Sequence, residues 1–502
     1  MGADPSSTPF LGVAPPEPRF ERLRRGIGLI LGPLVFIAVL LWAAEGLPPV
    51  QRKTLAVVLW ILIWWLTEAV PLPVSAILGP AMLVMAGVDT PAAVFAPFAD
   101  PVIFLFLGSF ILAEGIRASG LDRWLALRLL VRRSRPLSPR GALCTLGALT
   151  AGLSMWISNT ATAAVMYPLA LAVAKCYSGT ASGKKSPYAT SLLLTIAYAA
   201  SIGGVATPVG TPPNLLAIGQ LEKLTGVRIT FFQWMVLGLP VGLLMLVVCL
   251  CHLGRSSGEP WEKPAELAEE LRRLGPVTRR QRNVLAAFSL AVFLWIVPGL
   301  VGLVAGDRSW GQLPARLFPE SVVALLAASL LFILPVDGLK GASTLQWHEA
   351  SRLDWGTLLL FGGGLSLGTQ LFKSGLAGEF GSALVAWTGA TDTVSLTYLF
   401  GIVGLLLTET TSNTAAATVL CPLAIAAAQA AGVSPIPPAV AVAMGCSMAF
   451  MLPVATPSNA IVYGSGLLRL TAMVRHGLVM NLAGALLIPL LVVALCRLLG
   501  LS

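Results

Sequence analysis

The chain has 502 residues, of which 56% are hydrophobic and only 11% are charged. Soluble domains carry about 25% charged residues, so the composition excludes an ordinary soluble protein. Apolar runs of about 20 residues, the length that spans a bilayer, recur along the chain and predict an all-α polytopic membrane protein. The net charge of +10 does not indicate nucleic-acid binding, because the basic residues lie in short segments between spans, as is typical of the cytoplasmic side.

The N-terminal part of the chain is predicted to lie outside the membrane. Residues 1–27 begin with a stretch rich in Pro, Ser and Ala, which predicts disorder, and end with an arginine cluster of cytoplasmic type. A first transmembrane helix with its following turn is predicted over residues 28–53.

Residues 54–251 form the first of two units that follow the same plan. Inside this unit, the segment 141–176 has arginines before it and lysines after it. Because both ends are basic, the segment is predicted to enter and leave from the cytoplasmic face, as a re-entrant helical hairpin. The polar stretch 252–283 is predicted to be a cytoplasmic linker with a surface helix over 264–274.

Residues 284–502 repeat the plan in the opposite orientation. The matching segment, 395–431, has few basic residues on its flanks, so it is predicted to enter from the exterior face. The whole pattern predicts about eleven transmembrane helices plus two re-entrant hairpins in an inverted repeat, which is the architecture of secondary transporters.

Short motifs recur at matching places in the two units. The pairs are Phe106–Ser109 with Phe361–Gly364, Ser119–Leu121 with Ser374–Leu376, and Thr207–Asn214 with Pro453–Asn459. The third pair contains prolines in the middle of apolar runs, which predicts two broken helices.

Two Ser-Asn-Thr triplets lie near the centres of the hairpin segments, at Ser158-Asn159-Thr160 and Ser412-Asn413-Thr414. These residue types satisfy the free amides of a helix N-terminus, so each triplet predicts a helix that stops and restarts inside the membrane. Such a break is tolerated only where it faces protein or a water-filled cavity. Freed carbonyls and side-chain oxygens suit Na+, whereas the restarting helix ends suit a carboxylate.

A structural interpretation of the triplets competes with the functional one. Serine and threonine in membrane helices most often hydrogen-bond to the preceding turn, and one isolated triplet would favour that interpretation. Two copies at matching repeat positions, each paired with a Pro-Asn break, favour a binding site instead.

Charged residues inside the spans are weaker signals. Glu114 and Arg117 have the i, i+3 spacing of a structural pair, and for Glu68, at a span end, capping and function both stay open. Glu409 lies within one turn of Ser412, where it either orients the second triplet or helps to hold a cation. The three histidines form no metal-ligand pattern and no Ser-His-Asp arrangement is visible, so an enzyme is not predicted.

At these motifs the chain resembles the divalent anion/sodium symporter family, the Na+-coupled di- and tricarboxylate and sulfate transporters. The resemblance rests on the paired triplets and on the run from Cys446 to Pro453 that continues to Asn459–Val462. It implies a homodimer in which a hairpin-containing transport domain moves like an elevator against a scaffold. It also implies that the triplets bind substrate and that the broken helices complete two Na+ sites.

The resemblance assigns roles to single residues of this chain. Substrate contacts are implied for Ser158, Asn159, Thr160, Ser412, Asn413, Thr414, Thr456 and Pro457. Na+ contacts are implied for Ser154, Asn159 and Gly204 at the first site and for Thr408, Asn413 and Ala455 at the second. The repeats differ in two places: Ser458 matches Pro213, and Ala416 matches Thr162. The loss of a hydroxyl at Ala416 puts the strength and ion choice of the second site in question.

The sequence therefore predicts a Na+-coupled symporter for C4-dicarboxylates such as succinate, malate and fumarate, a multi-pass protein of the inner (plasma) membrane that needs no organic cofactor. A dianion entering an inside-negative cell works against about 4.6 kcal/mol per 100 mV, twice the single-charge value, so cation coupling is expected. The alternatives are a Na+-independent dicarboxylate exchanger, a sulfate or tricarboxylate symporter and, from other classes, a channel or a membrane enzyme.

Overall fold

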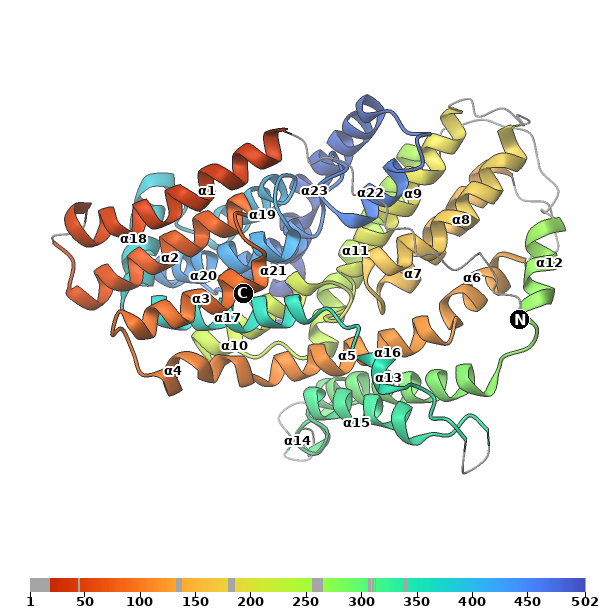
Figure 1. Ribbon diagram of the computed structural model, residues 1–502, viewed down its shortest axis with the longest axis horizontal. Helices are drawn as coiled ribbons and strands as arrows, with labels where there is room; N and C mark the ends of the chain where they lie inside the picture. Colours follow the sequence, from red (N-terminus) through yellow and green to blue (C-terminus); the bar gives the residue numbers. More distant parts are fainter. Residues whose placement is uncertain are drawn as a thin grey trace, which may run out of the picture.

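The computed structural model describes residues 19–43, 46–131, 138–178, 186–254, 265–305, 308, 311, 313–337 and 341–501. Over these residues the protein is built from helices (Figure 1), and extended segments pair only at an isolated bridge between Pro335 and Ser343. The helices of the first half are α1 (Arg19–Ala38), α2 (Pro49–Thr67), α3 (Leu72–Met85), α4 (Pro91–Phe95), α5 (Pro101–Ala118), α6 (Leu121–Val131), α7 (Pro139–Ser154), α8 (Asn159–Ser178), α9 (Pro187–Gly204), α10 (Pro212–Thr225) and α11 (Phe231–Leu253).

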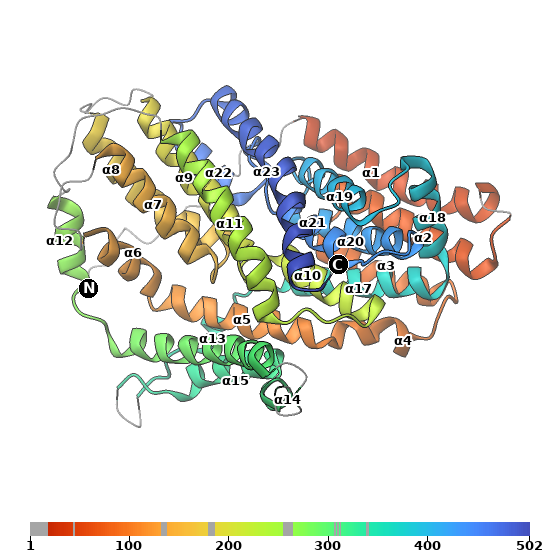
Figure 2. The same ribbon diagram turned by 180° about the vertical axis from the view of Figure 1, so that it is seen from behind.

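The second half begins with a helix in the polar linker. Its helices are α12 (Ala265–Leu274), α13 (Arg279–Ala305), α14 (Leu313–Leu317), α15 (Glu320–Ile333), α16 (Trp347–Ala350), α17 (Trp355–Lys373), α18 (Leu376–Thr388), α19 (Thr393–Leu407), α20 (Asn413–Ala430), α21 (Ile436–Cys446), α22 (Pro457–Tyr463) and α23 (Leu470–Leu498). The pair α1 and α2 lies near one end of the molecule and α12 lies at the opposite end (Figures 1 and 2).

Seven helices in the described residues are long and apolar enough to cross a membrane, or up to eight if a bent pair counts as one span. The bent pair is α18 with α19, which meet at 96°; Gly389 between them has φ +70°, a conformation that glycine adopts without strain. Four further apolar helices are shorter. The all-α polytopic fold is confirmed, whereas the count of about eleven spans stays a prediction.

Two predicted boundaries differ at the N-terminal end. The first helix begins at Arg19 rather than at residue 28, so the basic cluster forms its first turns instead of belonging to a tail. It continues as a π-helix to Ala43, and the next helix starts at Pro49, inside the predicted span of 28–53. Arg and Leu both favour helix, which accounts for the earlier start of α1. Residues 1–18 lie outside the described residues.

The linker helix was predicted almost to the residue, since α12 covers Ala265–Leu274. The predicted pairing of Glu114 with Arg117 is also confirmed: Nε of Arg117 donates to Oε2 of Glu114 over 2.8 Å.

The internal repeat is visible in two matching turns. Gly120 separates α5 from α6, and Gly375 separates α17 from α18; their φ angles are +65° and +85°. Both glycines lie in the aligned Ser-Gly-Leu motifs. A left-handed residue at the same place redirects the chain in each unit, and each turn is followed by one helix, α6 or α18, and then by a hairpin, α7/α8 or α19/α20.

The aligned Gly108 and Gly363 show the same repeat in packing. A Cβ at Gly108 would lie 2.5 Å from the carbonyl carbon of Ala324, and a Cβ at Gly363 would lie 2.2 Å from the carbonyl oxygen of Ala76. These glycines let α15 pack closely on α5 and α3 on α17. In both cases the partner helix comes from the other half of the chain, so the two units are interlocked.

The same exchange occurs around the hairpins. The helix after the second break, α22, packs on α8 and α9 of the first unit, while α10, after the first break, packs on α20 and α21 of the second. Each hairpin is thereby joined to the opposite unit through a short broken helix. The membrane face from which each hairpin enters stays a prediction.

Candidate functional site

The first hairpin has its tip where α7 ends at Ser154 and α8 begins at Asn159. Oγ of Ser154 lies 2.8 Å from Oδ1 of Asn159 and 2.7 Å from the carbonyl oxygen of Ala200 in α9. A hydroxyl has one proton and can donate to one of these acceptors at a time. Three oxygens therefore share a single proton, an electron-rich arrangement that suits a hard cation.

The second hairpin repeats this arrangement at its tip. Oγ1 of Thr408 lies 2.6 Å from Oδ1 of Asn413 and 2.6 Å from the carbonyl oxygen of Cys446 in α21. The exchange of serine for threonine keeps the hydroxyl, and the asparagine follows it at the same distance along the chain. Two such clusters at matching positions do not fit the structural interpretation, in which each hydroxyl only hydrogen-bonds to the preceding turn of its own helix.

Side-chain hydrogen bonds hold the first break together and join it to the first tip. Nδ2 of Asn214 donates to the carbonyl oxygens of Gly204 (2.9 Å) and Thr207 (2.7 Å). The hydroxyl of Thr207 donates to the carbonyl of Met155. A Cβ at Gly204 would lie 2.5 Å from Oδ1 of Asn159, so the predicted grouping of Ser154, Asn159 and Gly204 comes together in space.

The second break is held in the same way. Nδ2 of Asn459 donates to the carbonyl oxygens of Ala449 (3.1 Å) and Leu452 (3.0 Å). Ala449 is thus the geometric counterpart of Gly204. Ala455 lies further along, in the turn closed by its own N–H on the carbonyl of Leu452; it matches Gly210, whose Cβ would lie 2.5 Å from the carbonyl oxygen of Gly204. The role predicted for Ala455 stays a prediction.

Glu409 is a buried carboxylate, 3% exposed, at the second tip. It accepts hydrogen bonds from the backbone N–H groups of Phe450 (2.7 Å), Met451 (3.0 Å) and Leu452 (3.2 Å). Nδ2 of Asn481 in α23 donates to it as well, over 2.7 Å. Of the two roles left open by the sequence, the contacts favour the first: Glu409 fastens the second break to the second tip. At the matching position of the first tip, the backbone carbonyl of Met155 fastens the first break by accepting from the hydroxyl of Thr207.

The predicted substrate residues differ in exposure. Ser158 and Thr160 are exposed, Asn159, Ser412 and Asn413 are half-buried, and Thr414 is 9% exposed. Oγ of Ser158 caps α8 by accepting from the N–H of Ala161, whereas Ser412 makes no cap hydrogen bond. In the second break, Thr456 caps α22 and Pro457 at its start is exposed.

Several buried polar oxygens around the tips and breaks have no hydrogen-bond partner among the described atoms, although buried oxygens normally have one. They are Oγ1 of Thr162, Oγ of Ser201 and Oδ1 of Asn214 in the first unit, and Oγ of Ser458, Oδ1 of Asn459 and Oδ1 of Asn481 in the second. Unpaired oxygens of hydroxyls and amides suit a bound cation or water.

Two of these oxygens, on Thr162 and Ser458, belong to the positions at which the repeats differ. Thr162 lies on α8 and Ser458 lies on α22, two helices that pack together. Their counterparts, Ala416 on α20 and Pro213 on α10, lie on the other packed pair and bring no hydroxyl. Each difference therefore gives the α8/α22 pair a buried hydroxyl that the α10/α20 pair lacks at the matching position.

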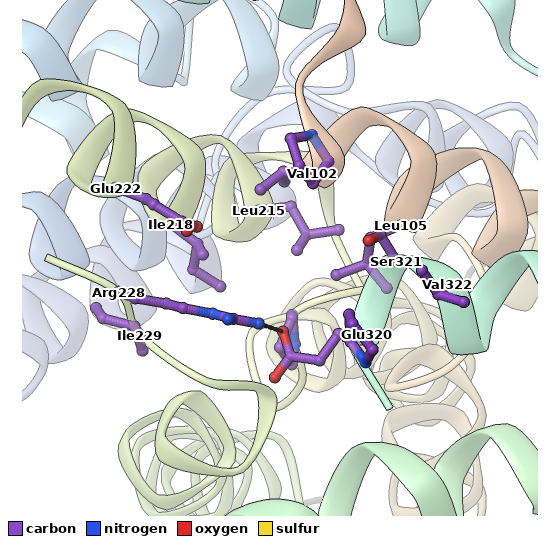
Figure 3. A pocket seen from close by; sticks show the side chains of 13 residues that line it. Val102, Leu105, Leu215, Ile218, Glu222, Arg228, Ile229, Glu320, Ser321 and Val322 are labelled. Atoms are coloured by element: carbon purple, nitrogen blue, oxygen red, sulfur yellow. Dashed lines mark ion pairs between the residues drawn. The ribbon is translucent and has the colours of Figure 1, made fainter. Parts of the chain in front are cut away.

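A cavity of about 330 Å³ lies beside the first break rather than between the triplets. It is lined by Pro101, Val102, Leu105, Pro208, Leu215, Ile218, Glu222, Arg228, Ile229, Pro319, Glu320, Ser321 and Val322. Figure 3 shows Arg228 pointing to Glu320 across it; their closest atoms are 4.0 Å apart. Glu320 also accepts from the N–H of Phe231 at the start of α11. The pair ties α15 to the segment before α11, and among the lining residues Pro208 alone belongs to the first break, residues 206–214.

Interlocked repeated units, two hairpin tips and two broken helices are typical of a secondary transport protein. A family model described as the sodium:sulfate symporter transmembrane region matches residues 27–501. The chain belongs to this family, as the resemblance to divalent anion/sodium symporters implied, and it is a transporter rather than an enzyme.

Relatives cover nearly the whole chain. The sodium-dependent dicarboxylate transporter SdcS of Staphylococcus saprophyticus is 34% identical over 480 residues, which are 93% of this chain and 90% of that protein. The protein of the same name from Staphylococcus aureus strain USA300 has the same identity and coverage. A solved structure of the YdaH transporter of Alcanivorax borkumensis has a TM-score of 0.53 at 16% identity, covering 79% of this chain and 86% of that one, and shows likeness of fold alone.

The sequence did not single out the asparagines that lock the breaks. Asn214 and Asn459 end the aligned Pro-Asn breaks, and that shared position was the available signal. Asn481, inside an apolar helix, was a polar residue without an assigned role, and its partner Glu409 lies 72 positions earlier.

Proposed function

We propose that the protein is a secondary active transporter that couples the import of a C4-dicarboxylate, such as succinate, malate or fumarate, to Na+. The proposal rests on the two matching clusters of hydroxyl, asparagine and carbonyl oxygens. They occur in a chain that is 34% identical over 93% of its length to proteins named sodium-dependent dicarboxylate transporters.

One Na+ binds at each tip. At the first, Ser154, Asn159 and the Gly204 backbone supply oxygens, and Ala200 adds a carbonyl. At the second, Thr408 and Asn413 supply oxygens together with a backbone carbonyl of the second break, from Ala455 or from its neighbour Ala449. The support is chemical: each cluster has more oxygen lone pairs than protons, and a cation removes that deficit.

The dicarboxylate binds to the two triplets. Ser158, Asn159 and Thr160 take one carboxylate at the start of α8, and Ser412, Asn413 and Thr414 take the other at the start of α20. Thr456 and Pro457, at the start of α22, approach the substrate from the second break. Helix N-termini supply amide donors and a partial positive charge, so they bind carboxylates without a basic side chain.

Coupling to Na+ gives the transport its direction. A dianion alone opposes the membrane potential by about 4.6 kcal/mol per 100 mV. Two Na+ ions cancel this charge, and a third makes import electrically favourable. The stored Na+ gradient then drives accumulation of the substrate.

The proposal includes an elevator movement in a homodimer of the inner (plasma) membrane. Helices α7 to α11 and α19 to α23 pack on one another through α7/α9, α11/α23 and α19/α21. Such a group is suited to move as one body that carries both tips. Cross-linking of purified protein in membranes tests the dimer, since monomers alone would refute that part.

A second candidate is a Na+-independent dicarboxylate exchanger, which the missing hydroxyl at Ala416 favours. Sulfate and tricarboxylates remain alternative substrates, sulfate because the matching family is described by it.

Uptake of radiolabelled succinate into proteoliposomes, with an inward Na+ gradient or with choline, tests the proposal. We expect uptake only with Na+, and competition by malate and fumarate but not by sulfate. Uptake that ignores Na+ and needs internal dicarboxylate would establish the exchanger instead. Sulfate uptake that succinate does not inhibit would refute the substrate class.

A further inference from the structure

Glu68 has an unusual backbone conformation at the end of α2. Its φ is +49°, and it is the non-glycine residue with positive φ in the described part of the chain. This left-handed conformation is uncommon for a residue with a Cβ, and here it ends α2, where the N–H of Glu68 donates to the carbonyl of Trp64. The side chain of Glu68 has a charged partner as well.

That partner is Arg24 of α1, which joins three segments. Its Nη2 lies 3.2 Å from Oε2 of Glu68, and both side chains are mostly buried, at 21% and 28% exposed. Its Nη1 donates to the carbonyl oxygen of Thr410 over 2.7 Å. Glu68 thus holds one side of the guanidinium while the other side reaches the second hairpin.

Thr410 lies at the second tip itself. It follows Glu409, which holds the second break, and precedes Ser412 by two residues. The tip is therefore restrained on both sides, by Glu409 from within and by Arg24 from α1. The N–H groups of Thr410 and Thr411 both point to the carbonyl of Leu407, so the carbonyl of Thr410 is at the outer side of a tight turn.

The first tip is restrained by different chemistry. Trp156 occupies the position that matches Thr410 and stacks on Phe231 with ring centroids 6.4 Å apart. It also meets the edge of Phe288 in α13 at 5.4 Å. Aromatic packing holds the first tip, whereas a charged hydrogen bond holds the second.

We propose that Arg24, oriented by Glu68, is a positioning residue for the second binding tip. Its hydrogen bond fixes the turn before Ser412, so that Ser412 and Asn413 are held in the arrangement that binds substrate and Na+. The effect on substrate affinity rests on the proposed function, whereas the effect on the mobility of the tip does not. Arg24 itself touches no substrate.

The main test is Arg24→Gln, which removes the charge and shortens the reach of the side chain. Hydrogen–deuterium exchange of the purified protein should become about tenfold faster in peptides covering 405–416. Peptides covering 151–162 serve as the control within the same molecule, because Trp156 holds that tip without Arg24. Unchanged exchange at 405–416, or an equal rise in both peptides, would refute the proposal.

Transport kinetics give the second readout. KM for succinate at saturating Na+ should rise about tenfold in Arg24→Gln, because the contact acts on the bound state before the tip moves away from α1. Arg273→Gln is the matched control: it removes an arginine from the exposed pair with Glu269 on α12 and should leave KM unchanged. A fall of kcat at constant KM would contradict the role.

Two further variants separate positioning from a simple ion pair. The double variant Arg24→Glu with Glu68→Arg keeps an ion pair but moves the guanidinium donor from α1 to the end of α2. KM should therefore stay raised. If it restores wild-type KM, the ion pair alone matters and the proposal fails. Glu68→Gly relieves the positive φ, so the protein should melt no earlier, yet KM should rise because Arg24 loses its holder.

The exchange measurement needs no substrate. If the wild-type protein showed no Na+-driven succinate uptake, the proposed function would be refuted. The rates of hydrogen–deuterium exchange at the two tips would still decide the role of Arg24.

Discussion

Glu409→Gln is the substitution that tests most sharply how the second site is built. The carboxylate is buried and accepts from three consecutive backbone N–H groups and from Asn481. Glutamine has nearly the same shape, so it leaves no cavity. It keeps one acceptor oxygen and replaces the other by an NH2 group, which is a donor.

The magnitude follows from the contacts that are lost. Oε2 accepts from the N–H groups of Met451 (3.1 Å) and Leu452 (3.2 Å). With an NH2 at that position, donors face donors and at least one buried N–H loses its partner, which costs about 1–3 kcal/mol. The hydrogen bonds that remain also lose the charge that strengthens them. We therefore expect the variant to be destabilised by about 2–4 kcal/mol.

Thermal unfolding in detergent, with and without Na+, measures the effect. Glu409→Gln should unfold well below wild type and should gain less from added Na+, because the break that supplies the second cluster is no longer fastened. Glu379→Gln, an exposed charge on α18, is the control and should match wild type in both conditions. An unchanged melting temperature and an unchanged Na+ response would refute the view that Glu409 holds the second break.

Three further predictions concern the clusters themselves. Asn159→Ala and Asn413→Ala should each abolish Na+-driven uptake while size-exclusion profiles stay as in wild type, because each removes one oxygen of a cluster; residual uptake above a tenth of wild type would count against that cluster. Gly204→Ala should lose uptake, since its Cβ would meet Oδ1 of Asn159 at 2.5 Å, whereas Gly152→Ala, with no atom within 4 Å of its Cβ, should transport normally. Ala416→Thr restores the missing hydroxyl and should lower the Na+ concentration for half-maximal uptake; a higher value would show that the second site has no room for it.

Much of the fold could be predicted because the signals are local. The Ser-Gly-Leu motifs around Gly120 and Gly375 are short and recur at the same offset, and both glycines adopt a left-handed conformation that glycine takes without strain. The triplets could be located for the same reason, since Ser, Asn and Thr at a helix start have few uses inside a membrane.

The register of the second site could not be predicted, because the sequence does not show which backbone carbonyl the asparagine of each break bonds. Between the carbonyl that contacts the tip hydroxyl and the asparagine that locks the break, the second unit is one residue shorter than the first. Ala449 takes the place of Gly204 because each lies ten residues before the asparagine that bonds its carbonyl, whereas the resemblance placed Ala455 there.

Contacts between distant segments were also beyond the sequence. Arg24 and Thr410 are separated by 386 positions, and a basic cluster before a first span is usually a topology signal. The helix start at Arg19 brought Arg24 into α1, and only the packed structure shows that its side chain faces the second tip.

The central claim is that Na+ and a dicarboxylate occupy one composite site formed by the two tips and the two breaks. Equilibrium binding of radiolabelled succinate to purified protein, titrated against Na+, tests it most directly. The account predicts that succinate binds tightly only when Na+ is present, and that succinate raises the affinity for Na+ by the same factor. Succinate binding that is equally strong without Na+, or that survives Asn159→Ala and Asn413→Ala together, would contradict it.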